Sequence, residues 1–270
     1  MNKSSKILIG IVVIGLGVLT FLSLPENAET PTISQVEDET DKSMKAAAVE
    51  VKVNPVSHAS FVLTFGDFII VNDPVGSADR FLESGQPDVI LVSDIHGDHL
   101  SVDTLIGLLG EQTQLIAPQA VIDEMPEQLV DQTMLLENGD SHQIDNLFIE
   151  ATPMYNLPME GPDYRHVKGR GNGYLLQIAD TRVYIAGDTE DIPEMRALAD
   201  IDYAFVPMNL PYTMDVAAAA DAVLEFEPRV VYPYHYRGPE GLSDIDQFAE
   251  LVGNNNPAIE VVLLDWYPEE

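Results

Sequence analysis

Two aspartates and two histidines, Asp94, His96, Asp98 and His99, lie within six residues of one another in this sequence. Residues 87–92 just before them are apolar and include β-branched side chains, which predicts a buried strand with the polar residues at its exit. In so short a turn these side chains can face one cavity, and Gly97 would let the backbone turn closely. Neutral imidazole and ionised carboxylate are usual ligands of Zn, Mn and Fe. The segment therefore predicts a metal site, the alternative being an acidic turn with surface histidines.

Further polar side chains follow three other predicted strands. Residues 181–186 lead to Asp188, residues 230–234 lead to His235, and residues 148–154 lead to Tyr155 and Asn156. Each of these is a weak indication alone, because Asp after Gly commonly forms a turn and a lone His is commonly a core residue. Their recurrence at strand ends predicts a common site.

Together these features resemble the metallo-β-lactamase-fold hydrolases, and among them the branch that includes the ascorbate-6-phosphate lactonase-like proteins. The family motif is His-x-His-x-Asp-His, then a separate His, an Asp in a Gly-Asp turn and a last His. Asp94 stands where the first His is expected, and Asn156 aligns with the separate His. The other positions match, at His96, Asp98, His99, Asp188 and His235. Residues 57–61, 72–74, 169–174 and 207–214 also resemble this branch, so the likeness extends from residue 49 to the C-terminus.

The resemblance implies two neighbouring sites for divalent metal ions that share Asp188. One site would hold Asp98, His99, Asp188 and His235. The other would hold Asp94, His96, Asp188 and Asn156, an oxygen-rich set that favours Mn, Fe(II) or Mg relative to Zn. We expect one or two divalent ions, Zn or Mn before Fe.

Several residues are expected to assist these ligands. Asp98 would orient the nucleophile and so act as the catalytic residue. His58 and Asp73 would support the ligands through hydrogen bonds.

The resemblance also implies an α/β fold, a four-layer αβ/βα sandwich of the metallo-β-lactamase type. Residues 51–53, 60–65 and 68–71 are predicted as a meander of strands, and residues 102–109 and 216–226 as helices. The second helix would begin after Thr213 or Asp215 and end before Pro228. Residues 49–270, about 220 in number, are a normal size for one hydrolase domain.

Residues 1–24 are predicted to be a membrane anchor or a signal peptide. Lys3 and Lys6 precede an uncharged, mostly apolar run long enough to cross a bilayer as a helix. Residues 25–48 are polar and acidic and are predicted to be a disordered linker. The flanking charges place the domain outside the cytoplasm, in the periplasm or on the outer face of the cytoplasmic membrane. It would be anchored, or secreted if cleavage follows Ala28 or Ala48.

The chain carries 45 acidic and 13 basic residues, a formal net charge of −32. Such a field repels phosphate backbones, so no nucleic-acid partner is expected. Against this background residues 165–170 concentrate cations, which predicts either binding of an anionic group or a solvated loop. The residues expected to bind an anionic small-molecule substrate are His166, Lys168, Arg170, Asn209 and Tyr212.

The sequence thus predicts a metal-dependent hydrolase whose metal-bound hydroxide cleaves an ester, lactone or phosphoester. A true β-lactamase is not expected, because the resemblance lies with another branch. The alternative is a non-catalytic extracytoplasmic metal- or ligand-binding protein of the same fold, suggested by Asp94 and Asn156 at ligand positions.

Overall fold

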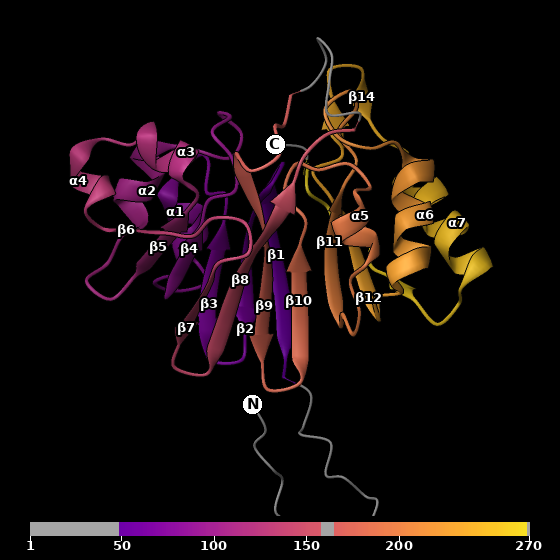
Figure 1. Cartoon of the computed structure of the whole chain (residues 1–270), viewed down its shortest axis with the longest axis horizontal. Helices are drawn as coiled ribbons and strands as arrows, with labels where there is room; N and C mark the ends of the chain where they lie inside the picture. Colours follow the sequence, from indigo (N-terminus) through magenta and orange to yellow (C-terminus); the bar gives the residue numbers. More distant parts are fainter. Residues whose placement is uncertain (1–48, 158–164, 269–270) are drawn as a thin grey trace, which may run out of the picture. The chain divides into compact units, whose positions relative to one another are not determined.

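The computed structural model describes residues 49–157 and 165–268, which form two packed β-sheets with helices on both outer faces (Figure 1). The strand order of the first sheet is β1 (Val51–Ser57), β2 (Ser60–Phe65), β3 (Phe68–Asn72), β4 (Val89–Leu91), β5 (Gln114–Ala117) and β6 (Thr133–Leu135). That of the second is β15 (Glu260–Val261), β12 (Val230–Tyr234), β11 (Tyr203–Pro207), β10 (Thr181–Ile185), β9 (Gly171–Ile178), β8 (Leu147–Met154) and β7 (Ser141–Ile144). The predictions for residues 1–24 and 25–48 lie outside the described residues.

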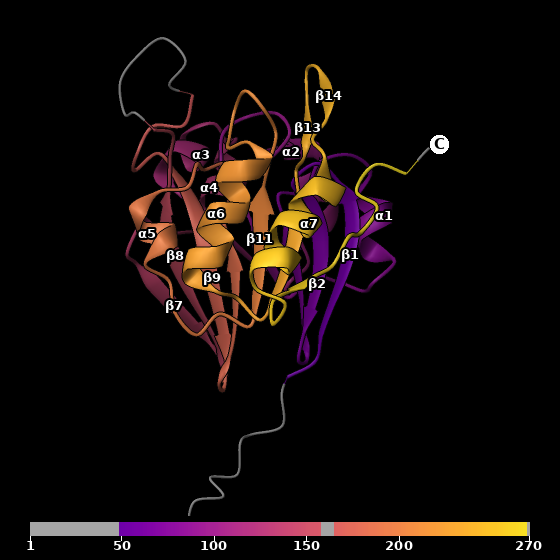
Figure 2. The same ribbon diagram turned by 90° about the vertical axis from the view of Figure 1, so that its right-hand side faces the viewer.

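The helices divide between the two sheets (Figures 1 and 2). Those on the first sheet are α1 (Ala78–Leu82), α2 (Val102–Leu108), α3 (Gln119–Asp123) and α4 (Glu127–Val130). Those on the second are α5 (Pro193–Arg196), α6 (Val216–Phe226) and α7 (Ile245–Asn255). A short hairpin, β13 (Arg237–Gly238) and β14 (Gly241–Leu242), follows β12. This arrangement confirms the predicted α/β class with four layers.

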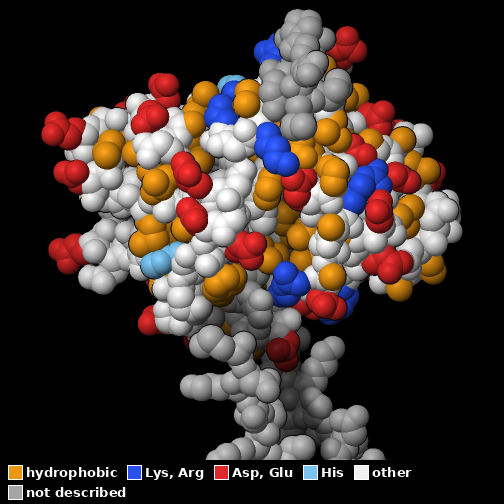
Figure 3. Space-filling model, in the orientation of Figure 1, with side chains coloured by type: hydrophobic (Ala, Val, Ile, Leu, Met, Phe, Trp, Pro, Cys, Tyr) orange, Lys and Arg blue, Asp and Glu red, His pale blue; other side chains and the backbone are white. Residues whose placement is uncertain are grey.

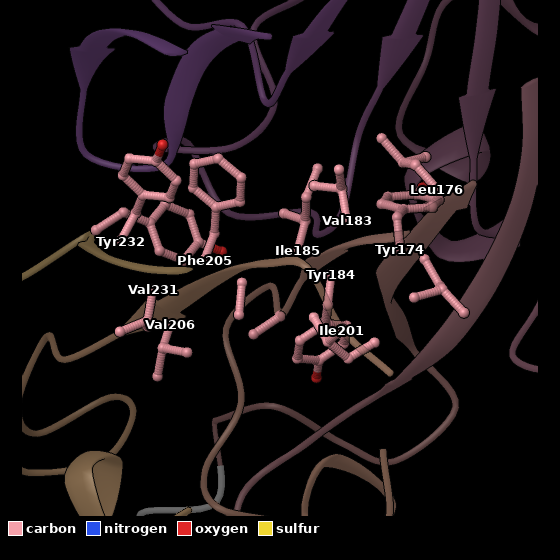
Figure 4. Close-up of a cluster of buried hydrophobic side chains, with 14 of the residues drawn as sticks. Tyr174, Leu176, Val183, Tyr184, Ile185, Ile201, Phe205, Val206, Val231 and Tyr232 are labelled. Carbon is pink, nitrogen blue, oxygen red and sulfur yellow. The ribbon is translucent and has the colours of Figure 1, made fainter. Parts of the chain in front are cut away.

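Alternation along the strands of the second sheet supplies two buried faces (Figure 4). Phe205 faces the first sheet and stacks on Phe61 of β2, with ring centroids 4.5 Å apart. Tyr184 faces the helices and contacts Phe226 of α6, at 6.2 Å between ring centroids. Because both faces are covered, the strands read as near-continuous apolar runs in the sequence.

Two hydrogen bonds join the sheets behind the loop that follows β4. Tyr174 Oη donates to the carbonyl oxygen of Val92 at 2.7 Å, although the residues are 82 positions apart. The backbone N–H of Asn172 donates to the carbonyl oxygen of Ser93 at 2.9 Å. The loop with the first predicted ligands is therefore attached to the backbone of the second sheet.

The predicted helix over residues 216–226 is confirmed, and Asp215 caps it rather than Thr213. The Asp215 carboxylate accepts a hydrogen bond from the N–H of Ala218 at 2.8 Å. Thr213 instead donates to the side-chain oxygen of Asn209. The helix ends at Phe226, and the next residue, Glu227, is left-handed (φ 45°) just before Pro228.

Acidic and basic side chains are distributed differently over the surface. On the face shown in Figure 3, Asp and Glu are spread widely, whereas Lys and Arg form small separate groups. In residues 49–157 and 165–268 no helix has both the length and the apolar character needed to cross a membrane.

Candidate metal centre

The predicted ligands follow the carboxyl ends of strands from both sheets. β4 leads to the loop with Asp94 and His99, and it runs parallel to β3 and β5. β10 leads to Asp188 and β12 to His235, and both strands run parallel to β11 between them. Since parallel strands end at the same edge of a sheet, their side chains converge there.

Three buried residues, His99, Asp188 and His235, form what we call the inner ligand group. Their ligand atoms lie within 4.8 Å of one another. Asp188 Oδ2 is 3.3 Å from His99 Nε2, and Asp188 Oδ1 is 3.3 Å from His235 Nε2. Within the described part of the chain, His99 Nε2 and Asp188 Oδ1 form no hydrogen bond. Buried polar atoms that converge without hydrogen bonds are suited to a cation.

The electrostatics of the inner ligand group agree with a cation site. Burial opposes the ionisation of Asp188, but His235 and His99 outweigh it and hold the pKa of that carboxyl well below its usual range. Burial likewise disfavours charged His99, yet Asp188 and Asp73 raise its pKa well above the ordinary value. A proton on His99 therefore balances the carboxylates, and a divalent ion would replace that proton.

Asp73 orients His99 from behind. The Nδ1 nitrogen of His99 lies 2.9 Å from Asp73 Oδ2, and Asp73 also accepts hydrogen bonds from the N–H and hydroxyl of Ser93, each at 2.7 Å. A proton on Nδ1 leaves the other nitrogen, Nε2, directed at Asp188. Asp73 thus has the contacts expected of a supporting residue.

Asp94, His96 and His166 form a second cluster, the outer ligand group, whose ligand atoms also lie within 4.8 Å of one another. His166 Nδ1 donates to the carbonyl oxygen of Tyr212 at 3.2 Å, which directs Nε2 towards the ligand groups. That nitrogen is 3.3 Å from Asp188 Oδ2 and 3.8 Å from Asp94 Oδ2. Asp188, a member of the inner ligand group, therefore also contacts the outer ligand group, as expected of a ligand shared by two metal ions.

The structure corrects the prediction that Asn156 is a metal ligand. Its side-chain oxygen accepts hydrogen bonds from the N–H groups of His166 and Arg165, at 2.8 and 3.0 Å. Its amide nitrogen donates to the carbonyl oxygen of Tyr212 at 2.8 Å. Asn156 thus holds the loop, and His166, predicted to bind substrate, lies at the ligand position.

Arg170 and Lys168 also differ from their predicted roles in substrate binding. Arg170 binds both carboxylate oxygens of Asp94, through Nε at 3.2 Å and Nη2 at 3.0 Å. Lys168 donates to Glu194 at 2.5 Å and lies 4.6 Å from the ring centroid of Tyr155. Both cations are directed at carboxylates of the protein itself.

Asp94 is buried, but its negative charge is compensated by neighbouring groups. Burial opposes its ionisation, whereas the hydrogen bond from His96, 2.6 Å away, and the charges of neighbouring groups lower its pKa. Neighbouring protein groups are therefore sufficient to keep the Asp94 carboxylate ionised.

A pocket of about 250 Å³ opens onto both ligand groups. Its described lining residues are His96, Asp98, Arg165, His166, Asp188, Asn209 and Tyr212. Asp98 has a side chain 40% exposed and lies 3.4 Å from His235 Nε2. Asn209 and Tyr212 were predicted to bind substrate, and both line this pocket. The guanidinium of Arg165 lies 5.3 Å from the Tyr212 ring centroid. From the sequence, Arg165 was recognised only as one of the clustered cations and was not assigned to the site.

His58 borders the inner ligand group. Its ligand atom lies within 4.8 Å of those of Asp98 and His235. Its ring is 5.5 Å from that of His235 and 5.1 Å from that of Tyr267, edge-on in both cases. Burial, followed by the nearby His235, lowers its pKa, so His58 is neutral at pH 7.

Gly187 rather than Gly97 is the glycine that the site requires. Gly187 has φ +67°, and a Cβ there would lie 2.9 Å from the carbonyl oxygen of Asn172. A Cβ on Gly97 would meet nothing within 4 Å, so the expected need for glycine in that turn was wrong.

The four-layer fold and the paired ligand groups define a metal-dependent hydrolase of the metallo-β-lactamase type. Residues 52–235 match the family model described as "Beta-lactamase superfamily domain", and the chain belongs to this family. A UPF0173 metal-dependent hydrolase of Pyrococcus horikoshii is 31% identical over 224 residues, which cover 79% of this chain and 96% of the relative.

Solved structures agree with this assignment. A candidate metal-dependent hydrolase from Parabacteroides distasonis is 36% identical, with a TM-score of 0.67 over 80% of this chain and 93% of the other. A metallo hydrolase from Ignicoccus hospitalis shares the fold, with 22% identity and a TM-score of 0.66, covering 80% and 95% of the two chains. The superfamily is thereby confirmed, while the lactonase-like branch stays a prediction.

Proposed function

We propose that this enzyme hydrolyses an ester, lactone or phosphoester bond in a small anionic substrate. The observation that carries the proposal is Arg165, which lines the same pocket as the metal ligands. Its guanidinium contacts the Tyr212 ring and forms no ion pair with a carboxylate of the described residues. In a chain of net charge −32, a guanidinium that lies beside the ligand groups and has no carboxylate partner among the described residues favours a negatively charged substrate.

Divalent ions fit both ligand groups. The inner ligand group with Asp98 offers two imidazoles and two carboxylates, a set that suits Zn. With His166 in place of Asn156, the outer ligand group offers two imidazoles and one carboxylate, which suits Zn, Mn or Fe(II). We propose one or two ions, Zn or Mn, with Fe(II) as the alternative. When bound, such an ion is a Lewis acid that lowers the pKa of water and polarises the scissile group.

The residues around the ions have separate tasks. Burial opposes the ionisation of Asp98, but the hydrogen bond from His235 and the charge of His99 hold the pKa of this carboxyl far below its usual range. Asp98 is therefore an acceptor at neutral pH and can orient the attacking water from the pocket wall. The side-chain oxygen of Asn209 accepts a hydrogen bond from Thr213 at 2.7 Å, and its amide nitrogen lies 3.2 Å from His235 Nε2. The second N–H of this amide can donate to a substrate oxygen. Arg165 can bind the anionic group of the substrate.

Elemental analysis of protein purified without added metal, followed by turnover assays, tests this proposal. We expect bound Zn, Mn or Fe, and metal-dependent turnover within a panel of bis(4-nitrophenyl) phosphate, 4-nitrophenyl butyrate and a γ-lactone. Arg165→Gln should raise KM for the anionic phosphodiester about tenfold and hardly change that for the neutral ester. Arg229→Gln is the matched control, since Arg229 pairs with Asp202 and does not line the pocket. No turnover with any of the three ions, or equal effects on both esters, would contradict the proposal.

We also propose that the hydrolase domain lies outside the cytoplasm, attached through residues 1–24. The support is the sequence itself, in which Lys3 and Lys6 precede an uncharged apolar run. Membrane fractionation combined with protease accessibility tests it. The domain should be accessible from outside, and a variant lacking residues 1–24 should stay in the cytosolic fraction.

A further inference from the structure

We propose that a second cavity, the Arg80–Arg237 cavity, binds a carboxylate or phosphate group that the substrate carries in addition to its scissile group. That the ligand is the substrate rests on the proposed function, whereas the anion site rests on the cavity itself. Its volume is about 490 Å³. Among the described residues its lining consists of Val56, Ser57, Arg80, Arg237, Trp266, Tyr267 and Pro268.

The charge of this lining is opposite to that of the chain. Two of the lining residues are arginines brought together from distant parts of the sequence, and none of the described lining residues is acidic. Arg80 Nη2 donates to the carbonyl oxygen of Val56 at 3.0 Å, which fixes the side chain through one of its five N–H groups. Neither guanidinium forms an ion pair within residues 49–157 and 165–268. In a protein with 45 acidic residues, this cavity is therefore a local cationic site.

Tyr267 orients the second guanidinium. Arg237 Cζ lies 4.0 Å from the centroid of the Tyr267 ring, a cation–π contact that fixes the plane of the guanidinium. Stacking of this kind leaves the N–H edges of arginine free for a bidentate contact with a carboxylate or phosphate. Burial raises the pKa of the Tyr267 hydroxyl, so this group keeps its proton and can donate to the same anion.

The cavity adjoins the metal centre through His58. The His58 ring contacts both Tyr267, at 5.1 Å, and His235, at 5.5 Å. One imidazole therefore touches both a wall residue of the cavity and the inner ligand group. A substrate with its scissile group at the ligands can place a second anionic group against Arg80 and Arg237. The substrate class is then an ester or phosphoester with a distal carboxylate or phosphate.

Titration of the full-length protein, as purified, with inorganic phosphate tests the anion site by calorimetry. Arg80→Gln and Arg237→Gln should each weaken one phosphate-binding event at least tenfold. The matched control Arg229→Gln makes the same change of charge on the surface and should stay within twofold of the wild type. Phosphate held at the metal ligands should respond to Arg165→Gln instead. Wild-type phosphate binding by the double variant Arg80→Gln/Arg237→Gln would overturn the proposal.

A pair of esters tests whether the anion belongs to the substrate. Arg237→Gln should raise KM at least tenfold for mono-4-nitrophenyl glutarate, which carries a distal carboxylate, and leave KM for neutral 4-nitrophenyl butyrate unchanged. If Arg237→Gln weakens phosphate binding but leaves the ratio of the KM values for the two esters as in the wild type, the anion that the cavity binds is not part of the substrate. If neither ester is hydrolysed, the proposed function loses support, while the phosphate titration still decides the anion site.

A variant that ends at Pro268 tests a competing occupant. Glu269 and Glu270 follow Pro268 in the sequence and lie outside the described residues. The variant should bind phosphate with wild-type affinity. A gain of tenfold or more would mean that these acidic residues occupy the cavity, and the proposal would be wrong.

Discussion

The inner and outer ligand groups differ in their enclosure and in what balances their negative charge. The side chains of His99, Asp188 and His235 are all at most 3% exposed, and each has a polar atom without a hydrogen bond in the described structure. In the outer ligand group the side chain of His96 is 39% exposed, and Arg170 binds Asp94 at both oxygens.

This difference implies unequal affinities for metal. The inner ligand group has no resident side-chain cation except protonated histidine, so an ion there replaces protons and satisfies buried atoms. In the outer ligand group an ion must share Asp94 with a guanidinium that already neutralises it. We therefore expect the inner site to bind metal more tightly than the outer one.

The largest effect should come from removing an imidazole of the inner ligand group. His99→Ala or His235→Ala should abolish tight metal binding and lower kcat/KM by at least about 100-fold, because each removes a buried imidazole from the inner ligand group. Elemental analysis and turnover measure this. His142→Ala is the control, since His142 bonds Gln114 and belongs to neither ligand group. Full metal content in either variant would refute the inner site.

Removing His166 should separate the two sites. His166→Ala takes an imidazole only from the outer ligand group, so the metal content should fall towards one ion per chain while the inner ion is retained. Asn156→Ala removes an amide that forms hydrogen bonds with backbone groups and should leave the stoichiometry unchanged. Elemental analysis of both variants decides the matter. The reverse result would restore Asn156 as the ligand.

Arg170 should have opposite effects on metal-free and metal-loaded protein. Arg170→Gln leaves the buried Asp94 charge without its guanidinium, which should cost about 3 kcal/mol of unfolding free energy in chelator-treated protein. Metal can then use an uncontested carboxylate, so the stabilisation on adding metal should be larger than in the wild type. Thermal unfolding with and without metal measures the difference. An equal loss in both states would show that Arg170 does not compete with metal.

A smaller effect is expected from the residue behind His99. Asp73→Asn keeps the shape but removes the negative charge that orients the imidazole, so affinity for the inner ion should fall about 10-fold. Competition with a metal indicator gives the affinity. Fold stability of the metal-loaded variant serves as the control. An unchanged affinity would mean that Ser93, whose hydroxyl oxygen lies 3.0 Å from His99 Nδ1, orients the imidazole without Asp73.

The smallest effect concerns Lys168, which lies outside both ligand groups. Lys168→Met should cost about 0.5 kcal/mol at neutral pH, because its ion pair with Glu194 is partly exposed. Burial opposes the ionisation of Glu194, but Lys168 outweighs it and lowers the pKa of that carboxyl. The stability from this pair is therefore present at neutral pH and lost as the pH falls below about 4. Denaturation at pH 7 and pH 3 measures this, and a raised KM would return Lys168 to substrate binding.

The strands and their polar exits could be predicted because each strand is a compact apolar run ending in a turn residue. The predicted strand over residues 60–65 matches β2, and that over residues 181–186 matches β10 within one residue. The buried faces of both sheets make such runs conspicuous in the sequence. The same patterns located Asp188 and His235.

The separate histidine and the role of Arg170 could not be predicted in this way. Distance from the end of β8 indicates Asn156, but the chain returns so that the N–H of Asn156 donates to the carbonyl oxygen of His166 at 3.0 Å. That proximity depends on tertiary hydrogen bonds, which sequence spacing does not record. A guanidinium binds a buried carboxylate as readily as a substrate anion, so composition alone could not distinguish the two partners of Arg170.

The hydrogen bonds from Tyr174 and Asn172 to the loop after β4 have a consequence for folding. They connect residues 82 and 79 positions apart, so the loop reaches its native position only after a large chain closure, a step that slows folding. Ligands from the two halves of the sequence then meet late, when the sheets have already docked. Neither half alone can assemble the metal centre. Metal ions should therefore slow unfolding and hardly change the folding rate, since they stabilise contacts made after the rate-limiting step.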